Sequence, residues 1–113
     1  VLLPKADHIV LTLPGEESNK GFLNKQLLLL CKPGAFIYNF GRGNALRSEA
    51  LESAIDHLGG VFLDVTDTEP LEKESQLWGN EKIMITPHSS CVYKEYKPLF
   101  IDEVIERLIA FQN

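Results

Sequence analysis

Four side chains suited to proton transfer or anion binding follow apolar segments of this 113-residue sequence. Arg42, Asp64, Glu69 and His88 each come shortly after such a segment. A histidine exchanges a proton near neutral pH, and a neighbouring carboxylate favours its charged form and fixes its orientation. An arginine binds an anion through a planar fork of donors. Together, the four residues would suit proton transfer at a carbonyl or hydroxyl group next to a carboxylate.

Each of these residues also has a simpler explanation. Arg42 lies between two glycines and suits a surface turn, and Asp64 suits the start of a turn after a strand. His88 follows a proline and suits the cap of a turn. Glu69 belongs to an acidic loop that also contains Asp67, Glu72 and Glu74. The residue types and their spacing leave both explanations open.

The elements that carry these residues alternate between strand and helix patterns. We expect strands at residues 8–13, 35–38, 61–65 and 82–86, and helices at 25–31, between Ser48 and Gly59, and near the end of the chain. Asn24 and Ser48 are suited to cap the first two helices, and Pro98 is tolerated near the start of the last. Alternation of this kind predicts an α/β fold, with right-handed crossovers and a parallel sheet covered by helices on both faces. The carboxyl ends of the strands then share one edge, where the four side chains can converge.

Composition excludes several classes of function. The formal net charge is −5 and no cluster of lysine or arginine stands out, which argues against a nucleic-acid or anionic-membrane surface. The apolar runs are far shorter than the roughly 20 residues of a membrane-spanning helix. Cys31 and Cys91 form no CxxC pair, and no secretory signal is recognisable, which favours a cytoplasmic setting. No spacing of histidine and cysteine indicates a metal site.

Four segments resemble, in order and spacing, the D-isomer-specific 2-hydroxyacid dehydrogenase family. They read LPKADHIVLTLPG, GFLNKQLLLLCKPGAFIYNFGRGNAL, LDVTDTEPL and LWGNEKIMITPHSS. The LW pair and the ITPHSS segment are most similar to glyoxylate/hydroxypyruvate reductases. The resemblance implies a Rossmann-type fold, NAD or NADP as the cofactor, and reduction of a small 2-keto acid or the reverse oxidation. It also implies a homodimer.

The resemblance also implies roles for individual residues. Arg42 matches the arginine that orients the substrate, Glu69 the carboxylate that pairs with the histidine, and His88 the acid/base. Asp64 matches an aspartate near the nicotinamide carboxamide. The residues that match the cofactor side are Leu13, Pro14, Phe40, Gly41, Arg42, Asp64, His88 and Ser90. Residues 66–68 differ from the aromatic and acidic residues that are usual in the family, and this difference does not touch the three catalytic matches.

Part of the expected binding domain is missing from the sequence. No G-x-G-x-x-G turn precedes a helix, and no strand ends in the residue that selects NAD or NADP. The chain also opens on Val1 rather than methionine. We therefore expect residues 1–113 to be the C-terminal half of a dinucleotide-binding domain, with the first half and a substrate domain upstream.

Such a half-domain has expected weaknesses, and its function has an alternative. We expect an unpaired sheet edge and an uncovered apolar face, weak dinucleotide binding and no activity in isolation. A dinucleotide-sensing corepressor or regulator of the same fold remains the alternative to an enzyme. The three catalytic matches are compatible with both.

Overall fold

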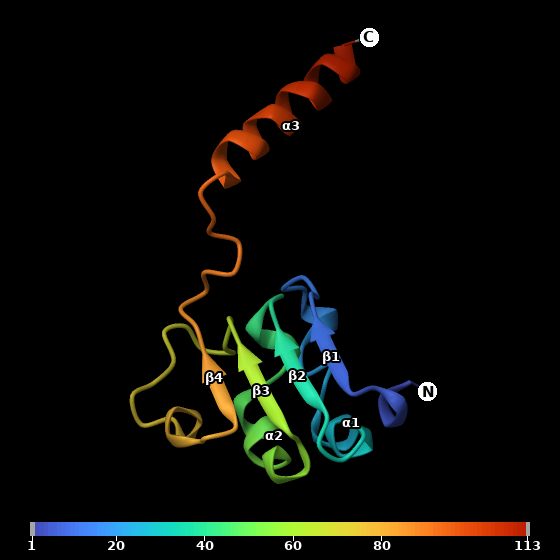
Figure 1. Ribbon diagram of the computed structural model, residues 1–113, viewed down its shortest axis with the longest axis vertical. Helices are drawn as coiled ribbons and strands as arrows, with labels where there is room; N and C mark the ends of the chain where they lie inside the picture. The colour runs from blue at the N-terminus through green and yellow to red at the C-terminus, as the bar shows by residue number, and fades with distance from the viewer. Residues whose placement is uncertain (1, 113) are drawn as a thin grey trace.

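Residues 2–112 are described by a computed structural model in which one parallel sheet forms the centre of the fold (Figure 1). Its strands are β1 (His8–Leu11), β2 (Phe36–Asn39), β3 (Gly60–Leu63) and β4 (Ile83–Ile85), and they lie across the sheet in that order. Each pair of neighbours is parallel. The predicted α/β fold with a parallel sheet is confirmed. Val1 lies outside the described residues.

The helices follow the predicted order but not all the predicted lengths. They are α1 (Lys25–Leu30), α2 (Ser48–Glu52) and α3 (Tyr96–Gln112). The 3₁₀ helices are Leu3–Lys5, Glu17–Asn19, Gly43–Ala45, Ile55–His57 and Gln76–Gly79. Asn24 caps α1 as predicted, because its side chain accepts a hydrogen bond from the backbone N–H of Leu27 at 3.0 Å.

The second helix differs from its prediction at both ends. α2 ends at Glu52, and the chain continues through Ala54, whose backbone is not helical, into a 3₁₀ turn. Ser48 is the first residue of α2 rather than its cap. The carboxylate of Asp67 accepts hydrogen bonds from the backbone N–H of Ser48 at 3.1 Å and from its hydroxyl at 2.5 Å. The acceptor at this helix start therefore comes from the loop after β3, which a local capping rule cannot reveal.

Helices α1 and α2 lie on the same face of the sheet (Figure 1). Strands in sequential order with right-handed crossovers place all of their connections on one face, so the predicted coverage of both faces is not found within residues 2–112. The core consists of side chains that this face and the helices bury, among them Leu28, Ile37, Leu51, Val61 and Leu63. On the opposite face Val10, Phe36 and Met84 are exposed, as expected for half of a domain.

Helix α3 projects away from the sheet at the end of an extended connection (Figure 1). Pro98 lies in its first turn, as predicted. Its apolar side chains are exposed, including Phe100, Ile105 and Leu108. Among the described residues, no helix combines the length and the apolar character that crossing a bilayer would require.

Two leucines of α1 offer a matched test of the core. Leu28 is completely buried, whereas Leu30 is 52% exposed. We expect Leu28→Ala to lower the free energy of unfolding by about 2–5 kcal/mol, because it leaves a cavity in the core. Leu30→Ala should cost much less. The midpoint of urea-induced unfolding measures both, and equal losses in the two variants would contradict this packing.

Candidate active site

Arg42 lies in the turn after β2, and the side chain of the buried Asn39, the last residue of β2, stabilises this turn. The side-chain oxygen of Asn39 accepts from the N–H of Gly41 at 3.2 Å, and its amide donates to the carbonyl of Arg42 at 3.3 Å. A Cβ added at Gly41 would lie 2.5 Å from the carbonyl oxygen of Leu13, so only glycine allows this close approach of β2 to the segment after β1. The guanidinium of Arg42 is exposed and donates to the carbonyl of Gly41 at 2.9 Å.

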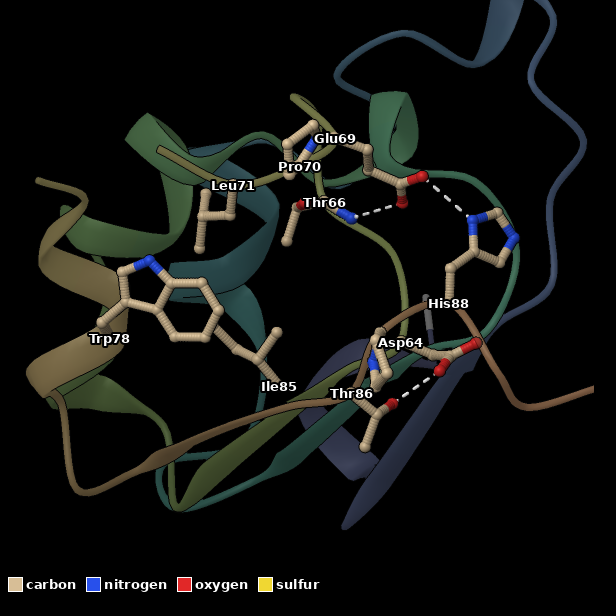
Figure 2. A pocket seen from close by; sticks show the side chains of 10 residues that line it. Asp64, Thr66, Glu69, Pro70, Leu71, Trp78, Ile85, Thr86 and His88 are labelled. Carbon is tan, nitrogen blue, oxygen red and sulfur yellow. Dashed lines mark hydrogen bonds and ion pairs between the residues drawn. The ribbon is translucent and has the colours of Figure 1, made fainter. Parts of the chain in front are cut away.

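His88 and Glu69 form a hydrogen-bonded pair on the loops that follow β4 and β3 (Figure 2). The Nδ1 of His88 lies 2.9 Å from the Oε2 of Glu69, and a carboxylate in this position accepts the Nδ1 proton. The Oε1 of Glu69 accepts from the backbone N–H of Thr66 at 3.2 Å, which fixes the carboxylate. The second ring nitrogen of His88 points away from Glu69 in Figure 2. It is therefore free to exchange a proton with a bound molecule.

The turn that carries His88 is held by the buried carboxylate of Asp64. Its Oδ1 accepts from the hydroxyl of Thr86 at 2.5 Å and from the N–H of Ser89 at 2.9 Å, and its Oδ2 accepts from the N–H of Ser90 at 2.9 Å. Burial acts to raise the pKa of Asp64, but these hydrogen bonds outweigh it and hold the pKa well below its usual range.

The lowered pKa of Asp64 has a consequence for stability. A group with a depressed folded-state pKa contributes stability that is fully present above its unfolded pKa of about 3.9. That contribution is lost as the pH falls below this value toward the folded-state pKa. Because its pKa lies well below the pH range in which a histidine titrates, the Asp64 carboxylate stays ionised throughout that range.

Two hollows share Thr66 and Glu69 in their linings. An open cleft of about 440 Å³ is lined by Arg42 and Glu69, together with Gly15 and Thr66. A second hollow of about 270 Å³ lies between the pair and the largely apolar side chains shown in Figure 2, among them Leu71, Trp78 and Ile85. The side chains of His88 and Glu69 are 42% and 41% exposed, and both line the second hollow, whereas only Glu69 also lines the cleft with Arg42.

The structure brings most of the predicted site residues to the carboxyl edge of the sheet. Arg42, Asp64, Glu69 and His88 all follow strand ends there, and the expected convergence of Glu69 with His88 is found. Arg42 lines the same cleft as Glu69, while its guanidinium donates a hydrogen bond to the backbone of its own turn.

The remaining residues with cofactor matches lie along the same edge. Leu13 lies against Gly41, and the exposed Pro14 accepts from the side chain of Asn19 through its carbonyl. Phe40 is 39% exposed and its ring lies 5.2 Å from that of Phe62, so its side chain belongs to the uncovered face. The backbone of Ser90 is bound to Asp64.

Sequence reasoning missed two residues that support the pair. Thr66 holds Glu69 through its backbone N–H, and its hydroxyl donates to the carbonyl of Thr68 at 2.7 Å. Thr86 binds Asp64 through its hydroxyl. The sequence offered one indication of these roles: each threonine lies close to the end of a strand that is followed by a predicted site residue.

Comparison with known proteins relates this chain to one group. The family described as "D-isomer specific 2-hydroxyacid dehydrogenase, NAD binding domain" matches residues 1–90. The (S)-sulfolactate dehydrogenase of Chromohalobacter salexigens is 38% identical to the chain over 96 residues, which cover 83% of this chain and 31% of that protein.

Solved structures agree with this relationship. A probable 2-hydroxyacid dehydrogenase of Rhizobium etli, in complex with NADP, HEPES and L(+)-tartaric acid, superimposes with a TM-score of 0.83 and 32% identity, covering 97% of this chain and 36% of that one. The NADPH-dependent glyoxylate/hydroxypyruvate reductase of Sinorhizobium meliloti, in complex with NADP and sulfate, gives a TM-score of 0.82 at 27% identity, with 97% and 36% coverage. The chain thus spans about a third of the length of these three proteins.

Proposed function

The chain belongs to the D-isomer specific 2-hydroxyacid dehydrogenase family, and from this membership we propose that it forms part of an enzyme that interconverts 2-keto acids and 2-hydroxy acids. Residues 1–113 would be the C-terminal half of its NAD(P)-binding domain, with the G-x-G-x-x-G half and the substrate domain in the remainder of the protein. The observation that carries the proposal is the hydrogen bond of 2.9 Å between His88 and Glu69, beside the cleft that Arg42 lines.

The residues of this chain fit one side of a dinucleotide. Three adjacent strands end at the proposed cofactor side. There the backbone of Gly41 lies so close to Leu13 that this position has no room for a Cβ atom. The proposed residues on this side are Leu13, Pro14, Phe40, Gly41, Arg42, Asp64, His88 and Ser90. A glycine-rich diphosphate turn is not part of the sequence, so the fit concerns the nicotinamide end. When bound, the nicotinamide supplies or accepts the hydride.

The proton steps follow from the side chains. In reduction, the guanidinium of Arg42 binds the carboxylate of the 2-keto acid and holds its carbonyl toward His88. The Nε2 of His88 gives its proton to the carbonyl oxygen while a hydride reaches the carbonyl carbon, which yields the 2-hydroxy acid. Glu69 orients the imidazole ring through the hydrogen bond at Nδ1. In oxidation, the Nε2 of neutral His88 takes the hydroxyl proton.

The proposal also has a finer part. We assign a small substrate such as glyoxylate or hydroxypyruvate, because the reductase of Sinorhizobium meliloti shares the fold of nearly the whole chain. We propose NAD or NADP as the cofactor. The NADP complexes among the similar structures support NADP. A homodimer in the cytoplasm, without nucleic-acid or membrane partners, completes the proposal, and the net charge of −5 supports the exclusion of nucleic acid.

Oxidation of reduced cofactor by the full-length protein tests this function. NADH and NADPH are offered in turn with glyoxylate, hydroxypyruvate, pyruvate and longer 2-keto acids. We expect turnover with at least one acid and a preference for the smaller ones. Cofactor binding without turnover on any acid would reject the enzyme and favour a dinucleotide-sensing regulator.

A further inference from the structure

One buried carboxylate organises the whole turn from which His88 projects. Asp64 is 2% exposed and lies at the end of β3, whereas the groups that it binds lie after β4. Three donors converge on it: a hydroxyl from Thr86, before His88, and two backbone N–H groups from Ser89 and Ser90, after it. The histidine is therefore enclosed between contacts to the same side chain.

The backbone of His88 needs such support. Its φ is 51°, in the left-handed region that residues other than glycine rarely adopt. Its own N–H donates to the carbonyl of Thr86 at 3.0 Å, which closes a tight turn. In this conformation the ring reaches the carboxylate of Glu69, on a loop that comes from another strand. A turn without the Asp64 contacts would have no comparable anchor on both sides of this residue.

The hydrogen bonds of Asp64 also limit what else it can do. An ionised carboxylate offers about four acceptor positions, and three are already taken within the chain. Asp64 lines the smaller hollow beside His88 and Glu69, but only 2% of the residue is exposed. These contacts within the chain are separate from the contact with the nicotinamide carboxamide that the family resemblance implies.

We propose that Asp64 is a positioning residue that acts through His88, holding the turn of residues 86–90 so that the imidazole meets Glu69 in a reactive orientation. This inference rests on the proposed function, because it concerns the same proton transfer. It adds a role for Asp64 and Thr86 that does not require either residue to touch the substrate or the cofactor.

The test uses Asp64→Asn and Thr86→Val in the full-length protein. Asn keeps the size of Asp64 but removes its charge and one acceptor oxygen, and Val keeps the shape of Thr86 without the hydroxyl. We expect Asp64→Asn to lower kcat at saturating cofactor by about 100-fold, the scale of a misplaced catalytic group. The dissociation constant of the cofactor should change by less than about 3-fold. Thr86→Val should show the same pattern more weakly, and Thr86→Ser should restore kcat.

The matched control is Asp56→Asn, which removes the charge of an exposed aspartate next to the other end of β3. It should leave kcat unchanged. A cofactor dissociation constant that rises while kcat holds in Asp64→Asn would overturn the proposal and assign a direct cofactor contact. Crystal structures of wild type and Asp64→Asn give a readout besides activity: loss of the contact between His88 and Glu69 supports the proposal, and its retention rejects it. If the wild type turns over no keto acid, the proposed function fails and this structural comparison still decides the role of Asp64.

Discussion

Replacing His88 by alanine in the full-length protein is expected to lower kcat by a factor of about 10²–10⁴, the range that a positioned general acid or base supplies. The loss should fall on the chemical step, since His88 is the proton donor in reduction and the acceptor in oxidation. The affinity for the cofactor should change far less. Single-turnover oxidation of the reduced cofactor, followed by absorbance, separates the chemical step from binding and product release.

A second histidine provides the control for this substitution. His8 is the exposed first residue of β1, and its Nδ1 lies 3.0 Å from the hydroxyl of Tyr38, at the opposite end of the strand from the carboxyl edge. His8→Ala removes the same ring and should leave kcat unchanged. If His88→Ala keeps its rate within a few-fold of wild type while His8→Ala does the same, another group must carry the proton.

Topology was enough to predict that His88 and Glu69 lie near each other. Parallel strands bring their carboxyl ends to one edge, and the sequence places both residues just after such ends. The end of β2 and the cap of α1 could also be predicted, because each depends on a local side chain. Asn39 accepts from a backbone N–H two residues further along the chain, and Asn24 accepts from one three residues further along.

What could not be predicted depends on contacts between distant segments. The role of Asp64 requires the N–H groups of Ser89 and Ser90 to point at one carboxylate, and this orientation is set by the turn after β4. The start of α2 is bound by Asp67, which is 19 residues away, so the local preference for a Ser48 cap was overridden. Likewise, helix-covered faces were predicted from alternation, but the sequential strand order decides that α1 and α2 share one face.

Gly43 is where the two halves of the site touch, and Gly43→Ala is expected to damage both stability and activity. A Cβ at this position would lie 1.8 Å from the carbonyl oxygen of Thr66, 2.1 Å from its carbon and 2.6 Å from the nitrogen of Asp67. All three atoms belong to the backbone, so no side-chain rotation relieves the clash. The turn that carries Arg42 must then move away from the loop that carries Glu69.

We expect Gly43→Ala to lower the free energy of unfolding by about 3 kcal/mol, the upper part of the usual range for overpacking. In the full-length protein kcat/KM should fall by about 100-fold, because the separation moves Arg42 relative to the His88–Glu69 pair. Gly79→Ala is the matched control: no atom lies within 4 Å of its added Cβ, and the backbone φ of Gly79 is not positive. Urea-induced unfolding and steady-state kinetics of both variants make the comparison. Equal behaviour of the two would show that Arg42 and Glu69 do not depend on the close packing of their loops.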